Sequence, residues 1–280
     1  MNPAARPAEP ESDVRMPLTE HLDELRKRLI RALIAVAIAF GGCWLVAAEL
    51  VAWLTLPLRE VEAHIGGVIG TGVTDAFFTK LKVSFIAALF VASPVIFFQA
   101  WQFVAPGLYQ REKRLAVPFS IAASFFFVAG AAFCYAIVFP VAFQFFLAEF
   151  ASVSLDPQIR ISEYLTFVSR MLLAFGITFE LPVVTFFLAR VGIVTHRTLI
   201  GGSRYAVVGI FILAAVLTPG PDVASQLLMA GPLLLLYGLS IGVAFVARRR
   251  DLAGEAPDAT TPPDPAAPPA PGTTRGPEES

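Results

Sequence analysis

The sequence predicts an all-α, polytopic membrane protein built from six tilted transmembrane helices. Hydrophobic residues make up 56% of the chain and charged residues only 15%, whereas soluble domains carry about 25% charged residues. Six long apolar stretches are separated by short loops, and about 20 apolar residues cross a hydrocarbon core of about 30 Å. The third observation is an uneven placement of lysine and arginine between alternate loops, which predicts the orientation.

Two tails flank the predicted membrane domain, which covers residues 18–250. Residues 1–17 are rich in proline, alanine and glutamate, and in residues 251–280 eight of 30 residues are proline. Such compositions cannot bury a core. Both tails are therefore predicted to be disordered.

The first half of the chain predicts three spans. Thr19 resembles an N-cap and is followed by leucines at helical spacing, which predicts a short amphipathic helix at the membrane surface running into a first span over 31–50. A glycine-rich loop is expected over 57–75. The second span covers 76–104 and the third covers 115–139, ending near Pro140.

The second half predicts three more spans. The fourth covers 162–191 and includes Glu180 and Pro182. The fifth, over 205–217, has only 13 apolar residues, which reach about 20 Å along a helix, short of a core of about 30 Å. The sixth covers 227–247 and includes Pro232.

Lysine and arginine placement predicts that both termini lie in the cytoplasm, because cytoplasmic flanks carry an excess of these residues. One set of alternate flanks holds thirteen: Arg26, Lys27, Arg28, Arg31, Arg111, Lys113, Arg114, Arg190, Arg197, Arg204, Arg248, Arg249 and Arg250. The other set holds four: Arg59, Lys80, Lys82 and Arg160. An even number of spans agrees with this orientation.

No pattern for a metal or cofactor site is present. Cys43 and Cys134 each lie within an apolar run and are read as small buried hydrophobic residues. There is no CxxC or HExxH spacing, and the glycines of 66–72 are not followed by a GK[ST] motif. We expect no metal, no cofactor and no nucleic-acid partner.

Two carboxylates among cytoplasmic bases are candidates for binding a cation. Glu24 lies one turn before Arg28, and the simplest interpretation is a surface helix with an i,i+4 ion pair. Glu112, near the start of the third span, is explained equally simply as a helix-dipole partner. The functional alternative is that both acids lie at one cytoplasmic face and accept guanidinium groups.

Glu180 lies between Phe179 and Leu181 within a span, where a carboxylate costs about 2.5–3.5 kcal/mol. It either makes a structural hydrogen bond to a neighbouring helix or lines a polar cavity, and Pro182 favours a kinked helix. Arg170 lies in the same span, about 15 Å away along the helix. We expect Arg170 to extend toward the outer surface rather than pair with Glu180.

Four separated motifs stand out along the chain: LTEHLDELRKR at 18–28, FVAPGLY with EKR at 103–114, FGITFELP at 175–182, and LTPGPD with SQ at 217–226. Together they resemble the TatC family, the core subunit of the twin-arginine protein translocase. The resemblance covers all six spans in order. It implies a cup-shaped helical bundle in the cytoplasmic membrane of a prokaryote. It also implies that the protein is not an enzyme.

The resemblance also implies roles for individual residues. Glu24 and Glu112, with Arg26 and Phe103, match the surface that binds twin-arginine signal peptides of folded substrates. Intramembrane polar or partner contacts are implied for Glu180, Gln226 and Asp222, and a loop role for Pro57. Implied partners are single-span TatA-type and TatB-type subunits, further copies in a receptor complex, and lipid, with transport powered by the protonmotive force.

Two departures from the family pattern stand out. Gly220 is inserted between Pro219 and Pro221, and Arg170 stands where a neutral residue is usual. Two other classes of function remain open on the residues alone: a small-solute transporter with Glu180 as its coupling carboxylate, and a structural anchor for an enzyme complex. A transporter of that class usually shows internal repeats, and none is evident in the sequence.

Overall fold

The structure, a computed structural model, describes residues 18–59, 68–70, 72–104, 116–152, 158–190, 192–218 and 223–254. Within these residues, six helical stretches are long and apolar enough to cross a membrane. They are Leu22–Leu45, Asp75–Phe103, Val117–Ser152, Ile161–Arg190, His196–Leu217 and Val223–Val246. The prediction of an all-α, six-span membrane protein is therefore confirmed.

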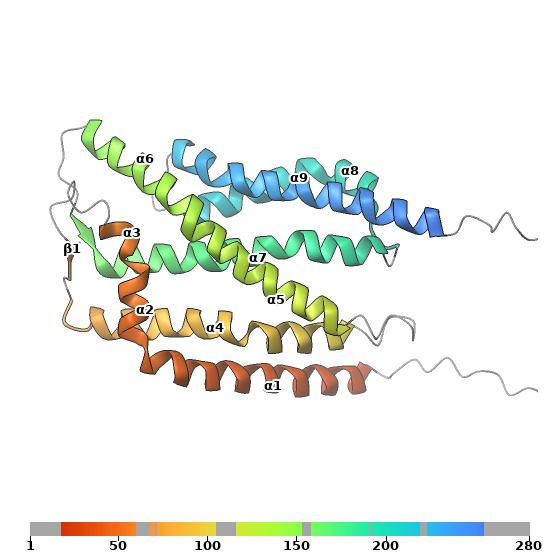
Figure 1. Cartoon of the computed structure of the whole chain (residues 1–280), viewed down its shortest axis with the longest axis horizontal. Helices are drawn as coiled ribbons and strands as arrows, with labels where there is room; N and C mark the ends of the chain where they lie inside the picture. The colour runs from red at the N-terminus through yellow and green to blue at the C-terminus, as the bar shows by residue number, and fades with distance from the viewer. Residues whose placement is uncertain are drawn as a thin grey trace, which may run out of the picture.

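The first span is one continuous helix, α1 (Leu18–Leu45), of 28 residues. The segment around Glu24 forms its first turns and, as predicted, runs directly into the first span. After Val46 the chain turns sharply into α2 (Ala47–Leu54) and α3 (Leu56–Arg59). Figure 1 shows α2 lying across the end of the bundle, nearly perpendicular to α1. The first span thus ends five residues before the predicted position 50.

Two tyrosines fasten α2 to the rest of the bundle. The hydroxyl of Tyr135 donates to the carbonyl of Trp53 at 2.9 Å, and that of Tyr164 donates to the carbonyl of Leu54 at 2.9 Å. The rings of Trp53 and Tyr135 also stack at 4.4 Å. The last carbonyls of α2, which have no partner within the helix, are satisfied in this way.

A short pair of parallel strands closes the same end. β1 (Val68–Ile69) pairs with β2 (Ile159–Arg160), joining the first and second loops of this end. The predicted glycine-rich loop over 57–75 therefore contains a strand and part of α3. Short, weakly patterned elements of two to four residues carry almost no periodic signal, which is why the sequence did not reveal them.

The second span nearly matches its predicted bounds, whereas the third span ends later than predicted. α4 (Asp75–Val104) runs through Pro94 without a break. α5 (Ala116–Phe133) continues through a π-helical turn, η4 (Cys134–Val138), into α6 (Phe139–Ser152). The prediction that the third span ends near Pro140 is wrong. The amide of Phe139 donates five residues back to Cys134, and Pro140 follows in the first turn of α6, where proline is tolerated.

α7 (Ile161–Arg190) is the central helix and the most buried of the six spans. It packs against α4, α5, α8 and α9. Glycines bring α5 and α7 close together: a Cβ on Gly130 would lie 2.6 Å from the carbonyl oxygen of Phe175, and one on Gly176 would lie 2.8 Å from the ring of Phe127. Small residues at such contacts let membrane helices approach closely.

The last two helices, α8 (His196–Leu217) and α9 (Val223–Gly254), pack on each other and on α7. α8 has 22 residues, nine more than the predicted fifth span, because Thr195 caps it upstream: its hydroxyl accepts from the amide of Thr198 at 3.3 Å. α9 ends at Gly254, so residues 251–254 of the predicted disordered tail are helical. Residues 1–17 and 255–280 lie outside the described residues.

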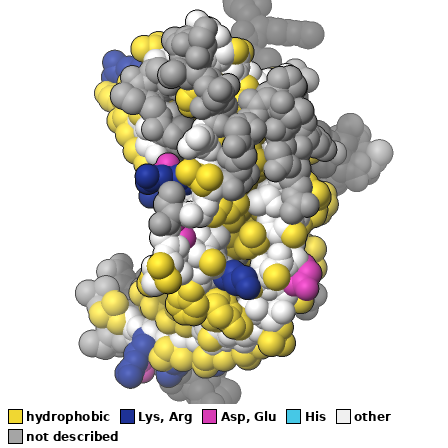
Figure 2. Space-filling view, turned by 90° about the vertical axis from the view of Figure 1, so that its left-hand side faces the viewer, with side chains coloured by type: hydrophobic (Ala, Val, Ile, Leu, Met, Phe, Trp, Pro, Cys, Tyr) yellow, Lys and Arg dark blue, Asp and Glu magenta, His cyan; other side chains and the backbone are white. Residues whose placement is uncertain are grey.

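The beginning of α1 and the end of α9 lie at the same end of the bundle, which we call the terminal end (Figure 1). The opposite end carries α2, α3 and the two strands, and we call it the strand end. Viewed from the strand end, the described part of the surface carries many hydrophobic side chains, with some Lys, Arg, Asp and Glu side chains between them (Figure 2). Along the helices, large hydrophobic side chains such as Ile38 of α1, Phe125 of α5 and Ile212 of α8 are exposed, which suits helices whose sides face lipid.

Candidate functional site

The strongest polar constellation at the terminal end joins α1 to α4. Arg28 pairs with Glu24 one turn earlier, and its Nε donates to Oε1 of that carboxylate at 3.1 Å. Nη1 of the same guanidinium donates to Oε1 of Gln102, near the end of α4, at 2.6 Å. The expected i,i+4 pair is thus present, and it also fixes α1 against the end of α4.

This ion pair is partly shielded from solvent. The side chain of Glu24 is 25% exposed and that of Arg28 is 15% exposed, whereas the neighbouring Asp23–Lys27 pair is 62% and 68% exposed. Both donors of Arg28 reach the same oxygen of Glu24, Oε1. Oε2 therefore receives no hydrogen bond from Arg28, and a carboxylate can accept several. A second guanidinium could bind there.

The other predicted members of this surface are only partly placed. Arg26 is exposed on α1, and Phe103, next to Gln102, is half-buried at the end of α4. Glu112 lies outside the described residues. Sequence reasoning missed Gln102 and gave Arg28 only a local role. The available signal was the position of Gln102 immediately before the FVAPGLY motif, but a contact across 74 residues has no periodic signature.

Glu180 lies inside α7, only 9% exposed, and close to the backbone of Phe127 on α5. Its Oε1 has no hydrogen-bond partner in the part of the chain that the structure describes. Of the two sequence hypotheses, a position against a neighbouring helix describes this burial better than a position on an open polar surface. A buried carboxyl oxygen without a donor costs free energy, so a further polar partner would stabilise it.

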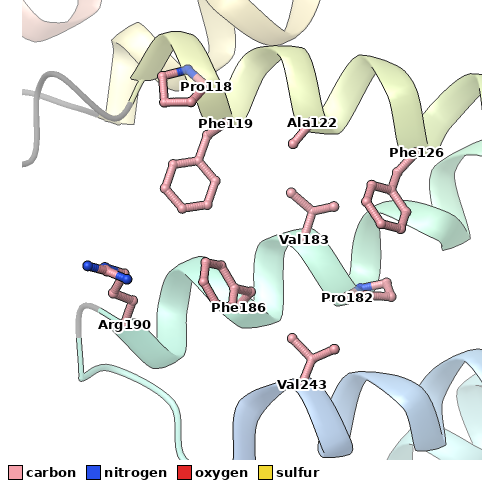
Figure 3. Close-up of a pocket in the computed structure, with 9 residues that line it drawn as sticks. All are labelled: Pro118, Phe119, Ala122, Phe126, Pro182, Val183, Phe186, Arg190 and Val243. Atoms are coloured by element: carbon pink, nitrogen blue, oxygen red, sulfur yellow. The ribbon is translucent and has the colours of Figure 1, made fainter. Parts of the chain in front are cut away.

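An apolar cavity of about 430 Å³ lies between α5 and α7, beginning two residues after Glu180 (Figure 3). Pro182, Val183 and Phe186 line it from α7, facing Phe119 and Phe126 of α5. Arg190 lies at one end of the cavity. Apart from Arg190 at its far end, the walls are hydrocarbon, so this space provides no donor beside Glu180 and suits an apolar occupant.

The remaining predicted positions are structural in the described residues. Gln226, in the first turn of α9, donates its Nε2 to the carbonyl of Phe211 on α8 at 2.9 Å and so ties these helices together. Pro57 is the second residue of α3 and is half-buried, a position where its missing amide costs nothing. Asp222 lies outside the described residues.

Metal or redox chemistry finds no support in the described residues. No group of three or more His, Cys, Asp or Glu side chains there could hold a metal ion. Cys43 and Cys134 are both buried and unpaired, as the sequence predicted. Cys134 lies within the π-helical turn, and its role is packing.

Comparison with known proteins gives one consistent result. The family model "TatC: Sec-independent protein translocase protein (TatC)" matches residues 20–232. A Sec-independent protein translocase protein TatC from Desulforapulum autotrophicum is 45% identical over 236 residues, covering 84% of this chain and 87% of the relative. The protein of the same name from Campylobacter jejuni is 45% identical over 228 residues, covering 80% and 91%.

The fold agrees with the sequence relationship. A crystal structure of the twin arginine translocase receptor TatC superposes with a TM-score of 0.75 at 36% identity, covering 82% of this chain and all of the other. A second structure of that receptor, in a detergent, gives a TM-score of 0.74. The family is one of protein translocases rather than of enzymes. This chain belongs to the TatC family of Sec-independent protein translocase proteins.

Proposed function

We propose that this chain is the core subunit and signal-peptide receptor of a twin-arginine translocase, which exports folded proteins across the cytoplasmic membrane using the protonmotive force. Membership of the TatC family supports the general role, and the solved relatives are described as twin arginine translocase receptors. The single observation that carries the receptor role is the geometry of Glu24.

Glu24 is suited to an arginine side chain of a signal peptide. Its carboxylate is held by Arg28 through one oxygen only, leaving Oε2 for a charge-assisted bond. Phe103 lies next to Gln102, the residue that Arg28 also binds. Glu112, which lies outside the described residues eight positions after the end of α4, is assigned to the same surface by its match to the family motif. Arg26 would complete this surface by contacting the backbone of the signal peptide.

The proposed orientation places both termini in the cytoplasm. The first and last described helices begin and end at the terminal end, and the cation-rich set counted from the sequence includes the flanks at the beginning of α1, the end of α7 and the beginning of α8. The membrane is then the cytoplasmic membrane of a prokaryote, with the strand end outside. Pro57 would shape the first outer loop, where α3 follows the end of α2.

Single-span TatA-type and TatB-type subunits are the proposed partners, together with further copies of this chain. α1 and α8 offer the least buried spans, so both have room for partner helices in the membrane. Glu180, Gln226 and Asp222 are the proposed polar contacts for them. The free oxygen of Glu180 would accept a hydrogen bond from such a partner.

Glu180→Gln should impair transport and partner assembly less than Glu180→Leu. An amide can keep a hydrogen bond to a partner helix, whereas leucine cannot. Export of a reporter and co-purification of the single-span subunits measure the difference. Thr178→Val, which removes a hydroxyl bonded only within α7, is the matched control and should behave as wild type. Equal, unimpaired transport by both Glu180 variants would remove Glu180 from the proposed contacts.

The proposed function is tested by export in a bacterial strain that lacks its own TatC. Supplied with this chain and its single-span subunits, the strain should export a folded fluorescent reporter carrying a twin-arginine signal. The same reporter with both arginines changed to lysines should stay in the cytoplasm, because the ammonium of lysine lacks the planar fork of donors of a guanidinium. Export of both reporters, or of neither while the chain inserts normally, would refute the proposal.

A further inference from the structure

A polar cavity of about 350 Å³ lies near the strand end, between the beginning of α7 and the end of α8. It is lined by Ser162, Glu163, Thr166, Phe167, Arg170, Leu217 and Thr218. It differs from the apolar cavity beside α5 because a cation, a carboxylate and three hydroxyl groups face it. None of these residues belongs to the proposed signal-binding surface.

Arg170 is the unusual member of this cavity. Its side chain is exposed, and it makes no hydrogen bond or ion pair with the described residues. The other charges nearby are engaged: Arg160 pairs with Glu163 at 3.3 Å, and Lys82 donates to the hydroxyl of Thr166 at 2.7 Å. Of these three cations, Arg170 is the one without a partner among the described residues.

The depth of Arg170 places its guanidinium near lipid headgroups. α7 has 30 residues, about 45 Å of helix, which exceeds a core of about 30 Å by about 7 Å at each end. Arg170 lies nine residues after Ile161, about 14 Å along the axis, and thus about 6 Å below the hydrocarbon boundary. Side chains on a helix point toward its N-terminus, here toward the strand end, and a long side chain can cover that distance.

We propose that this cavity binds the phosphate group of an anionic membrane phospholipid, held by Arg170. The ammonium group of Lys82, positioned by Thr166, supplies a second donor. Arg160 holds the carboxylate of Glu163 and so reduces its repulsion of the phosphate. The unpaired intramembrane arginine gains a charge-assisted partner, which offsets the cost of placing it in the span.

A lipid fits this site better than a free anion because the surroundings are apolar. Phe167 and Leu217 form part of the cavity wall, and on the adjoining turns of α8 the side chains of Ile212 and Val216 are 62% and 67% exposed. Acyl chains of the bound lipid would lie along these side chains. The phosphate of a phospholipid thus matches the cation at the headgroup level, and its two acyl chains match the apolar side chains below that level.

The test is native mass spectrometry of the purified full chain titrated with phosphatidylglycerol or with phosphatidylcholine. The wild type should bind at least one phosphatidylglycerol more tightly than phosphatidylcholine. Arg170→Gln should weaken that binding about tenfold or more, because a hydrogen bond between charged groups is lost. Arg170→Lys should be intermediate. Arg204→Gln, which removes an exposed arginine at the other end of α8, should match wild type.

Several results would overturn the proposal. Unchanged phosphatidylglycerol binding by Arg170→Gln is one, and equal weakening by Arg204→Gln, which would indicate only a general surface charge effect, is another. If Arg170→Gln binds lipid normally but loses a co-purifying single-span subunit, the ligand is a partner carboxylate and not a lipid. If Arg170→Gln does not elute as a folded protein, Arg170→Lys is the deciding variant. In that case, equal affinity of Arg170→Lys for phosphatidylglycerol and phosphatidylcholine would refute the site.

Discussion

Glu24→Ala and Glu112→Ala should each abolish crosslinking of a twin-arginine signal peptide to this chain, while membrane insertion stays normal. Each carboxylate is proposed to accept an arginine of the signal. Its loss leaves a guanidinium without a charge-assisted partner, at a cost of about 1.5–3 kcal/mol, or roughly tenfold to hundredfold in affinity. Site-specific photocrosslinking in membrane vesicles measures the effect. Glu112→Gln should be intermediate, because an amide accepts but carries no charge.

The matched control for Glu24 is Asp23→Ala. Asp23 lies on the same helix and pairs with Lys27 at 3.6 Å, but this pair is exposed and contributes little. The Asp23→Ala substitution should therefore leave crosslinking unchanged. Arg28 keeps its bond to Gln102 in the Glu24 variant, so α1 should stay against α4. Normal crosslinking by both glutamate variants would show that the signal binds elsewhere.

Gly130→Val should prevent stable assembly of the bundle. A Cβ at this position would lie 2.6 Å from the carbonyl oxygen of Phe175 and 2.8 Å from the side chain of Phe179. The carbonyl oxygen of Phe175 belongs to the backbone of the central helix, α7, so rotating a side chain cannot relieve this clash. Overpacking typically costs about 1–3 kcal/mol and more where backbone must move. Thermal unfolding in detergent should show a large loss of stability.

Gly209→Val is the control for this substitution. Gly209 also lies within a helix, α8, but a Cβ there meets no atom within 4 Å. Both variants change the same residue types within a membrane helix, so the difference isolates the α5–α7 contact. Equal stability of the two proteins would mean that α5 and α7 do not approach as closely as the structure indicates.

The sequence predicted the spans well where hydrophobicity alone decides the outcome. Within the described residues α4 begins within one residue of its expected start and ends where expected, and α7 nearly matches its predicted bounds. The pair between Glu24 and Arg28 also followed from helical spacing. These features depend on neighbours close in the chain, and such local interactions leave a periodic trace.

Other features depend on contacts far apart in the chain and were not predicted. The π-helical turn at Cys134 lets the helix continue past Pro140, although proline usually marks a helix boundary. α2 lies across the strand end, where the hydroxyls of Tyr135 and Tyr164 donate to its last two carbonyls from helices far along the chain. The bond between Arg28 and Gln102 crosses 74 residues. No window of sequence contains both members of such pairs.

The most direct test of the receptor role is the affinity of a twin-arginine signal peptide for the purified full chain in lipid nanodiscs. Fluorescence anisotropy would compare the natural peptide with one in which lysines replace both arginines. The planar guanidinium presents a fixed fork of donors that the ammonium of lysine lacks, so the wild type should prefer the arginine peptide about tenfold or more. Glu24→Ala should lose this preference. Equal affinity of the wild-type chain for both peptides would contradict the account.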